Sequence, residues 1–552
     1  MEKLKVIGVA LGPDRTKSDF IPFLKECLDD EDVVLEALAK NIVNLVDVIG
    51  IDTCELLISI IEPLLGAEQS KVRDQAVESC TSLGKEMSPE QIQQHFYPLL
   101  SRLHSSCWYT PQISLAPLIS VVYPHVDNEK KGELRTVYQK LVAAETPLIR
   151  RSASASLGNF VLVLEDEFLP GVMELFKSVT EDDQDFVRFM AVGSCVSLCS
   201  RLSPEQVKER ILPVTKKLAT DNAWRVRYMA ADRFCDLSKG LGEEIAKAEM
   251  IDIFVQLLQD REGEVRSAAC SQITGFCNLL TEEIIIKSIL PPVSELANDV
   301  DESVRASLAG DVMGLAPLLG KEKTLEHLLS LFLKLLSDEF YEVRLSVISK
   351  LNGINQVVGI ELLSDSLLPA ITQLAEEKQW RVRLAIINFI PLLAKQLGVE
   401  FFDDKLATLC LNWLVDPVYS IREAASKNIK ELIEVFGSEW AKSSIIPKVL
   451  EFCNHQNYLY RGTTLLSITA LSTVVGTEIV ESTLLPLVLN MVSDNVPNIR
   501  FKVAKTLQIM INHVSSTTIH SKIVPALETL LTDDDKDVRY YANQAIKSIP
   551  SE

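Results

Sequence analysis

The chain has 552 residues, with 76 Asp or Glu against 55 Lys or Arg, so its formal net charge is −21. Such an excess of acid disfavours a protein that binds the phosphate backbone of nucleic acid, because that binding requires clustered positive charge. No segment approaches the roughly 18 unbroken apolar residues of a membrane span, so no membrane association is predicted. The expected partners are proteins.

The N-terminal segment, residues 1–12, has two lysines before a short apolar run, and Pro13 follows at once. The run is too short for a secretory signal, so none is predicted. The eleven cysteines are odd in number and scattered, which indicates reduced thiols. We therefore predict a cytoplasmic protein, with room for a nuclear pool.

An arginine recurs every 39 residues through most of the chain, at Arg188, Arg227, Arg266, Arg305, Arg344, Arg383, Arg422, Arg461, Arg500 and Arg539. Six residues before each stands an acid, except that His455 precedes Arg461. Upstream, Arg150, Gln112, Arg73 and Val34 occupy the same slot with small slips. A glycine ladder, at Gly320, Gly359, Gly398, Gly437 and Gly476, and a proline ladder share the period. The chain is therefore a tandem repeat of one structural unit.

The unit at 362–398 contains two apolar runs of helical spacing, separated by the polar segment 376–379. The short connection predicts an antiparallel helical hairpin, with Gly398 as the left-handed stop of its second helix. A lone hairpin cannot bury its apolar face, so the copies must stack. We predict an all-α fold, an α-α superhelix of about 14–15 hairpins of 39 residues that forms a single solenoid over 1–552. The low glycine content disfavours a β-propeller.

The slot before Val34 would precede residue 1, so the first hairpin is expected to lack its first helix. Val6, Val9 and Leu11 are then expected to be accessible, and we favour a sequence that starts late. Within each repeat, the acid is expected to accept amide hydrogens at the opening of the second helix. The arginine is expected to reach an acid of a neighbouring repeat, so both are interpreted as structural.

Residues for catalysis or cofactor binding are not found in any recognised pattern. Cys195 and Cys199 share a helix face, but they fall in an apolar pattern without a nearby histidine, so they are interpreted as core residues. The seven histidines lie in different repeats, and no phosphate-binding loop, Gly-x-Ser-x-Gly or His-Glu-x-x-His is present. We predict a protein that is not an enzyme and that uses no cofactor and no metal.

Four consecutive repeats carry an aromatic residue three positions before the ladder arginine, at Tyr341, Trp380, Tyr419 and Tyr458. We call these four residues the aromatic row. The position is expected to lie in the loop between the two helices, where exposed rings in a row indicate a protein interface. The alternative is that each ring packs on its neighbour and seals the loops. Trp224 and Trp380 each begin the same sequence motif, Trp-Arg-Val-Arg, so two docking zones are predicted. Trp108 and the segment 147–151 add further anchors to the N-terminal half.

Four longer strings make a resemblance specific: DNAWRVRYM at 221–229, WRVRLAII at 380–387, QLGVEFFD at 396–403 and IPKVL at 446–450. With these strings in this order, the chain resembles, over essentially its full length, the HEAT-repeat scaffold (A) subunit of protein phosphatase type 2A. The resemblance implies a non-catalytic scaffold in a heterotrimer whose other members are the phosphatase catalytic subunit plus an exchangeable regulatory (B-type) subunit.

The same resemblance implies a catalytic-subunit zone at 340–552 and a regulatory-subunit zone at 30–240. The residues of this chain that it implies as contacts of the catalytic subunit are Tyr341, Trp380, Arg381, Tyr419 and Tyr458. The residues of this chain that it implies as contacts of the regulatory subunit are Trp108, Pro147, Arg150, Arg151, Trp224 and Arg225. Gln112 stands where the family pattern leads us to expect a basic residue, so the preference among regulatory subunits can differ.

A different class of long acidic solenoid is the importin-like nuclear transport receptor, which binds basic cargo and a GTPase. That alternative predicts an irregular period and acidic clusters along the inner helices. The regular 39-residue period and the position of the aromatic anchors disfavour it, and a chromatin-associated HEAT protein lacks support from basic stretches.

Overall fold

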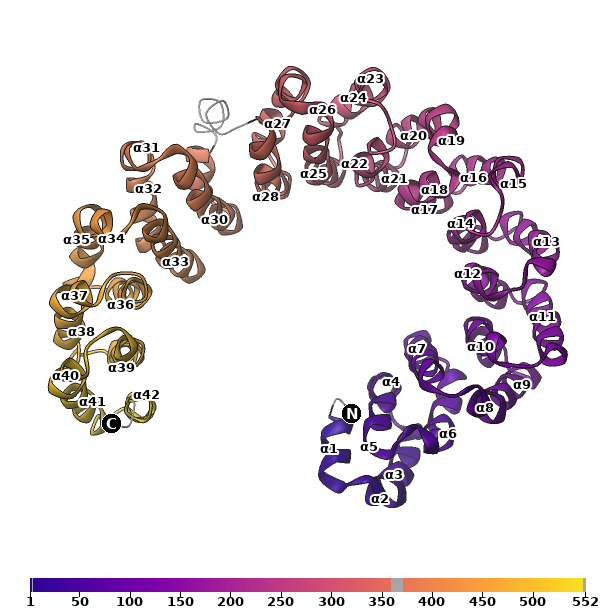
Figure 1. The fold of residues 1–552 in the computed structure, drawn as a ribbon, viewed down its shortest axis with the longest axis horizontal. Coiled ribbons are helices and arrows are strands. Elements are labelled where there is room, and N and C mark those ends of the chain that lie inside the picture. The colour runs from indigo at the N-terminus through magenta and orange to yellow at the C-terminus, as the bar shows by residue number, and fades with distance from the viewer. Residues whose placement is uncertain (2, 359–370, 550–552) are drawn as a thin grey trace. The chain divides into compact units, whose positions relative to one another are not determined.

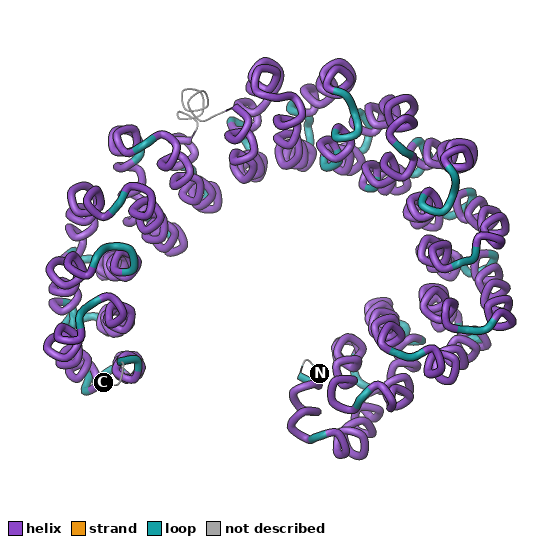
Figure 2. Tube along the Cα trace, viewed as in Figure 1, coloured by secondary structure: helices purple, strands orange, loops and turns teal. Residues whose placement is uncertain are grey.

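The structure is a computed structural model that describes residues 1, 3–358 and 371–549. It divides into two compact units, Met1–Leu296 and Ala297–Glu552. Figures 1 and 2 show that each unit is built from helical hairpins joined by short loops, and the described residues contain no β-strand. The predicted all-α fold of stacked hairpins is confirmed. The continuous solenoid predicted over 1–552 stays a prediction, as does the division into binding zones.

In the first unit, the second helices of successive hairpins lie side by side. They are α4 (Asp32–Asn41), α7 (Ser70–Glu86), α10 (Tyr109–Val122), α12 (Pro147–Val163), α14 (Asp185–Cys199), α17 with α18 (Trp224–Asp232, Phe234–Leu241) and α21 with α22 (Gly263–Cys270, Ile273–Cys277). The first helices form the other layer: α2 and α3 (Pro13–Arg15, Ile21–Glu26), α6 (Cys54–Leu65), α8 and α9 (Pro89–Gln91, Tyr97–Ser105), α11 (Asn128–Val142), α13 (Leu169–Thr180), α15 and α16 (Pro204–Gln206, Leu212–Ala219), α19 and α20 (Glu243–Ile245, Ile251–Leu258), and α23 and α24 (Glu282–Ile284, Leu290–Leu296).

The second unit repeats the arrangement. Its second helices are α25 (Glu302–Asp311), α28 (Tyr341–Val358), α30 (Trp380–Leu397), α33 (Tyr419–Phe436), α36 (Tyr458–Ser472), α39 (Pro497–Met510) and α42 (Lys536–Lys547). Its first helices include α27 (Leu329–Leu336), α31 and α32 (Val399–Lys405, Ala407–Asn412), α34 and α35 (Ser438–Trp440, Ile446–Leu450), α37 and α38 (Thr477–Ile479, Leu485–Asn490), and α40 and α41 (Ser516–Thr518, Val524–Leu531). Gly359 and most of the first helix predicted for the unit 362–398 lie outside the described residues.

The core runs between the two layers and continues from one hairpin to the next. Phe234 of α18 contacts Phe254 of α20 with ring centroids 4.7 Å apart, and both contact Phe276 of α22 at 4.9 and 4.8 Å. All three rings are fully buried. Because Phe276 belongs to the next hairpin, one cluster ties two repeats together, as the stacking argument requires. No helix of the described residues is both long and apolar enough to cross a membrane.

A π-helical turn interrupts most first helices at the same place in the repeat. Among the described residues, these turns are Thr16–Phe20, Ile92–Phe96, Val207–Ile211, Ala246–Met250, Ile285–Ile289, Thr324–Leu328, Ala441–Ile445, Val480–Leu484 and Ile519–Ile523. In five of the nine, the proline ladder follows as the second residue of the next α-helical segment, as Pro213 does in α16, and Pro22 and Pro98 take the same place in two others. A proline donates no hydrogen bond and its ring clashes with the carbonyl four residues earlier, and a widened turn relieves that clash. The same turn forms before Asp252 and Ser330, so proline is not required for it.

Three glycines of the glycine ladder end second helices at positive φ: Gly320 at 70°, Gly398 at 82° and Gly437 at 89°. Gly398 is therefore the helix stop that the sequence predicts. Its ψ of 173° is extended rather than left-handed helical, which is a region that only glycine occupies readily. Gly476 differs, because its φ of −65° is open to any residue.

The helix α1 (Leu4–Leu11) precedes the first complete hairpin and packs against α5 (Val46–Ile49). Leu4 and Gly8 are buried, whereas Val6 and Val9 are each 64% exposed and Leu11 is half-buried. The exposure expected for the valines is confirmed.

Candidate protein-docking sites

The ladder arginines connect adjacent repeats within each unit. Arg227 donates from Nε and Nη2 to the two carboxylate oxygens of Asp260, at 2.6 and 2.8 Å, and from Nη1 to the Asp221 carbonyl oxygen at 2.8 Å. Other ion pairs spaced by the same 33 residues are Arg188–Asp221, Arg305–Asp338, Arg344–Glu377, Arg383–Asp416, Arg461–Asp494 and Arg500–Asp533. The predicted structural role of the ladder is confirmed.

The ladder acids also close the loop before the second helix. Asp338 Oδ1 accepts a hydrogen bond from the Phe340 amide at 2.9 Å, and Asp221 Oδ1 accepts one from Ala223 at 2.9 Å. These amides lie just before the helix rather than in its first turn. Burial alone would raise the pKa of the Asp338 carboxyl, but the hydrogen bonds from Arg305 and Phe340 outweigh it and lower that pKa.

The aromatic row begins the second helices and does not lie in the loops, so the expected loop position is wrong. Tyr341, Trp380, Tyr419 and Tyr458 are the first residues of α28, α30, α33 and α36. The Tyr419 side chain is 51% exposed and that of Tyr458 40%, while Tyr341 and Trp380 are half-buried. In the described part of the chain, no two rings of the row are paired with one another, so the alternative that each ring packs on its neighbour is not supported.

The two Trp-Arg phrases adopt the same local geometry in the two units. The Arg381 guanidinium lies 4.8 Å from the centre of the Trp380 ring, and the Arg225 guanidinium lies 4.8 Å from that of Trp224. Both arginines are exposed and both tryptophans half-buried at the start of a second helix. A flat ring with a stacked guanidinium presents apolar area beside hydrogen-bond donors, the composition of an interface hot spot.

The remaining N-terminal anchors differ in accessibility. Trp108 caps the start of α10 and is 75% exposed, and its neighbour Tyr109 is 45% exposed. Pro147 begins α12 and is half-buried, whereas Arg151 is exposed.

Arg150 is a ladder arginine whose donors are already used. Its guanidinium binds Asp182 and Asp183 and the loop carbonyls of Ala144 and Glu145. Sequence reasoning missed Tyr109, although it adjoins the predicted anchor Trp108, whereas Leu148, which is 41% exposed, lies in the predicted segment 147–151.

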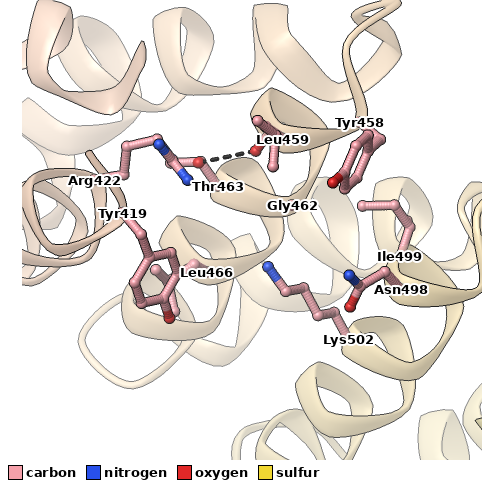
Figure 3. A pocket seen from close by; sticks show the side chains of 10 residues that line it. All are labelled: Tyr419, Arg422, Tyr458, Leu459, Gly462, Thr463, Leu466, Asn498, Ile499 and Lys502. Carbon is pink, nitrogen blue, oxygen red and sulfur yellow. Dashed lines mark hydrogen bonds between the residues drawn. The ribbon is translucent and has the colours of Figure 1, made fainter. Parts of the chain in front are cut away.

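A pocket in the second unit was also missed by sequence reasoning. It has a volume of about 220 Å³ and lies between α33, α36 and α39. Figure 3 shows Tyr419 and Tyr458 of the aromatic row in its lining, with Arg422, Asn498 and Lys502. The sequence did contain a signal for it, because His455 breaks the ladder in the repeat that follows Arg422.

Cys195 and Cys199 are both buried, which confirms their interpretation as core residues. Burial raises the pKa of Cys195 to about 12 and that of Cys199 to about 11, which keeps both thiols protonated. One cluster among the described residues, Cys54 with Glu55 and His95, has the spacing of metal ligands. Burial raises the pKa of the Cys54 thiol, which disfavours the thiolate that a metal requires.

Two protein-family models match parts of the chain. A PPP2R1A-like HEAT repeat matches residues 243–320, and a PIK3R4-like middle domain matches residues 395–512. The hairpins within residues 243–320 are therefore similar to HEAT repeats.

Several curated proteins are similar to parts of this chain. The regulatory A subunit of protein phosphatase PP2A from Schizosaccharomyces pombe is 46% identical over 216 residues, which is 38% of this chain and 37% of the relative. A probable PP2A regulatory subunit of Caenorhabditis elegans is 41% identical over 216 residues, 39% of this chain and 37% of the relative. A protein phosphatase 2A scaffold subunit of Dictyostelium discoideum is 49% identical over 169 residues, 30% of this chain and 29% of the relative. The matched regions thus span 29% to 37% of the length of these relatives.

Solved structures of nuclear import proteins share the fold. A structure of Kap95p with RanGDP matches 97% of this chain and 72% of its own with a TM-score of 0.64 and 13% identity. Karyopherin Kap121p bound to the extreme C-terminus of the protein phosphatase Cdc14p matches 97% of this chain and 57% of its own, with a TM-score of 0.54 and 14% identity. At such low identity the similarity shows the fold alone.

Proposed function

We propose that this chain, a HEAT-repeat protein similar to the regulatory A subunits of protein phosphatase 2A, is a non-catalytic scaffold of a phosphatase heterotrimer. Its relatives are named as regulatory or scaffold subunits of a serine/threonine phosphatase. The observation that carries the proposal is the pair of matched Trp-Arg anchors, one in each unit. Two equivalent anchors in separate units provide two docking sites for two different proteins.

The catalytic subunit is assigned to the aromatic row and Arg381, in the zone 340–552. Tyr419 and Tyr458 supply exposed ring area, and Trp380 supplies a partly buried ring beside an exposed guanidinium. Large rings at the start of rigid helices lose little conformational freedom on binding, which suits them to hot spots.

The exchangeable regulatory subunit is assigned to the zone 30–240, with Trp108, Pro147, Arg151, Trp224 and Arg225 as contacts. Arg150 completes that set, and its bonds to the carbonyl oxygens of Ala144 and Glu145 fix the loop before Pro147. The exposed guanidinium groups of Arg151 and Arg225 suit acidic or carbonyl-rich partner surfaces. The reduced cysteines agree with a cytoplasmic site of action, with a nuclear pool.

The test compares Trp380→Ala with Trp224→Ala in two separate pull-downs, one with a phosphatase catalytic subunit, the other with a regulatory subunit. Trp380→Ala is expected to weaken catalytic-subunit binding by about 30- to 1000-fold, the equivalent of losing roughly 2–4 kcal/mol. Trp224→Ala is expected to leave that interaction intact and to impair binding of the regulatory subunit.

Each variant is the matched control of the other, because both remove a half-buried tryptophan that begins a second helix. Circular dichroism and thermal melting of both variants check the fold. The two-site scaffold is refuted if both variants lose the same partner equally, or if Trp380→Ala loses helical signal and melts early.

A further inference from the structure

The ladder is interrupted at His455, in the loop before α36. Its Nδ1 accepts a hydrogen bond from the Asn457 amide at 3.0 Å, as a ladder aspartate does, so the loop keeps its closure. The ring also contacts Tyr460, with centroids 4.5 Å apart. An imidazole carries no carboxylate, so it cannot take over the second task of the ladder acid, which is to bind the arginine of the preceding repeat.

Arg422 is the arginine that this substitution leaves unpaired. Its Nη1 donates to the carbonyl oxygens of Asp416 and Pro417, at 2.7 and 3.0 Å, as in other repeats. Its Nε and Nη2 have no acceptor, and no acid pairs with it, among the residues that the structure describes. The residue is only 6% exposed. A guanidinium that lines a pocket with two donors unused favours a ligand that accepts from both.

Lys502 of α39 brings a second positive charge to the same pocket. Its Nζ lies 3.0 Å from the point that a Cβ would occupy at Gly462, so the absence of a side chain at Gly462 makes room for the ammonium group. No carboxylate pairs with Lys502 in the described part of the chain. Burial, with the nearby charges of Arg422 and Lys505, lowers the pKa of Lys502, which an incoming anion would reverse.

The lining of the pocket contains both cations and no acidic residue, in a chain whose net charge is −21. Figure 3 shows Arg422 and Lys502 on different helices around the same space, with Tyr419, Tyr458 and Asn498 beside them. Tyr419 and Tyr458 also belong to the aromatic row. The pocket is therefore continuous with the surface assigned to the catalytic subunit.

We propose that the pocket formed by Arg422 and Lys502 binds the carboxylate of an acidic side chain on the protein that docks at the aromatic row. The inference rests on the proposed function and adds the chemistry of one contact. In the neighbouring repeats, Arg383 and Arg461 bind the carboxylates of Asp416 and Asp494, at 3.0 and 2.7 Å. A carboxylate supplied by the partner would enter the pocket that Arg422 and Lys502 line and would give Arg422 the pairing that its neighbours have.

The decisive variant is His455→Asp, which restores the ladder acid inside the chain. The new carboxylate is expected to pair with Arg422, to raise the melting temperature, and to weaken catalytic-subunit binding about ten- to hundredfold. A gain in stability together with a loss of affinity separates this effect from misfolding. His455→Asn keeps an acceptor for the loop without adding charge, and it is expected to leave affinity unchanged within a factor of about three, since it adds no anion to compete for Arg422.

A second measurement identifies the group that enters the pocket. Carbodiimide joins a lysine amine to a carboxylate in direct contact, so cross-linking of the full chain with a phosphatase catalytic subunit is expected to join Lys502 to an Asp or Glu, as peptide mass spectrometry would reveal. Lys502→Arg is expected to abolish this cross-link and to retain binding. Lys505, whose ammonium lies 4.0 Å from the centre of the Tyr541 ring, is the internal control and is expected to remain unlinked.

The outcomes separate the two proposals. If the wild-type chain binds no phosphatase catalytic subunit, the proposed function fails and this inference fails with it. If the wild type binds and His455→Asp binds equally well, or Lys502 forms no cross-link, only the pocket assignment is overturned. Loss of wild-type binding after dephosphorylation of the catalytic subunit would assign a phosphate in place of the carboxylate, and would also overturn it.

Discussion

A ladder arginine uses one guanidinium for two connections. Arg305 donates from Nη1 to the Asp299 carbonyl in its own loop, at 2.6 Å, and from Nε and Nη2 to Asp338 in the next repeat. The side chains of the pair are only 8% and 9% exposed. Shielding from water strengthens the attraction, and it also makes the loss of either partner expensive.

Arg305→Ala is expected to destabilise one joint between repeats by roughly 1–3 kcal/mol, because the Asp338 carboxylate would stay buried without its partner. Hydrogen exchange is expected to speed up around Asp338 at the start of α28. Arg210→Ala, which removes an exposed arginine on a first helix, is the control and is expected to change stability by less than about 0.5 kcal/mol. Unchanged protection around Asp338 would show that the pair contributes nothing.

Acid is expected to loosen the same joints. The pKa values of Asp221, Asp260, Asp338, Asp494 and Asp533 are all lowered in the folded chain. Carboxylates of this kind add stability above their unfolded pKa, near 3.9, and that stability is lost as the pH falls through the lower folded values.

Urea unfolding is therefore expected to show a steep loss of stability below about pH 4. The free energy of unfolding of the double variant Arg305→Ala, Asp338→Ala is expected to fall less than that of the wild type over that pH range, because the variant has one such pair fewer. An equal loss in both proteins would assign the acid sensitivity to other groups.

At the scale of the helix, matched glycines test how the repeats end. Gly437 adopts φ 89° and ψ 164°, and Gly476, one repeat later, adopts φ −65°. A Cβ would meet no atom within 4 Å at either position, so only the backbone conformation distinguishes them. Gly437→Ala is expected to cost about 1–3 kcal/mol, and Gly476→Ala is expected to be neutral or slightly stabilising. Chemical denaturation measures both, and equal effects would contradict the argument.

The sequence predicts the helices well because each repeat shows the same apolar spacing and the same loop acids. It does not predict the π-helical turns, since apolar spacing reports which face is buried and not how many residues one turn contains. It also misplaces the aromatic row by a short step, because a first helical residue and a last loop residue look alike in a pattern. Gly476 shows the same limit, as a periodic position does not ensure a repeated φ.

At the scale of the whole molecule, repeats that contact only their neighbours lose order locally. The helix α1 is held by Leu4 and by the Thr16 hydroxyl, which donates to the Gly8 carbonyl at 3.1 Å, while Val6 and Val9 are open to water. Hydrogen exchange of α1 is expected to be at least tenfold faster than that of α12 in the same unit, and limited proteolysis is expected to cut first within residues 1–20. Equal protection of the two helices, or residues 1–20 left intact, would show that α1 is firmly anchored.

The candidate site was only partly predictable. A Trp-Arg phrase at a repeated position identifies Trp224 and Trp380 as anchors, because both chemistry and position are written in the sequence. The pocket at Arg422 depends on Lys502, which lies 80 residues away along the chain and reaches the site only through the stacking of α33, α36 and α39. The substitution at His455 was visible, but its effect on Arg422 needed the 33-residue pairing that the structure reveals.

The interruption at His455 also links assembly to turnover. If the partner supplies the missing carboxylate, the free chain keeps one loose joint between α33 and α36, and the assembled chain does not. A partner present at one hundred times its dissociation constant would add about 2.7 kcal/mol to the folded state, concentrated at that joint. Proteases act on segments that open, so the unassembled chain would be cleared first, and its cellular amount would follow that of the protein it holds.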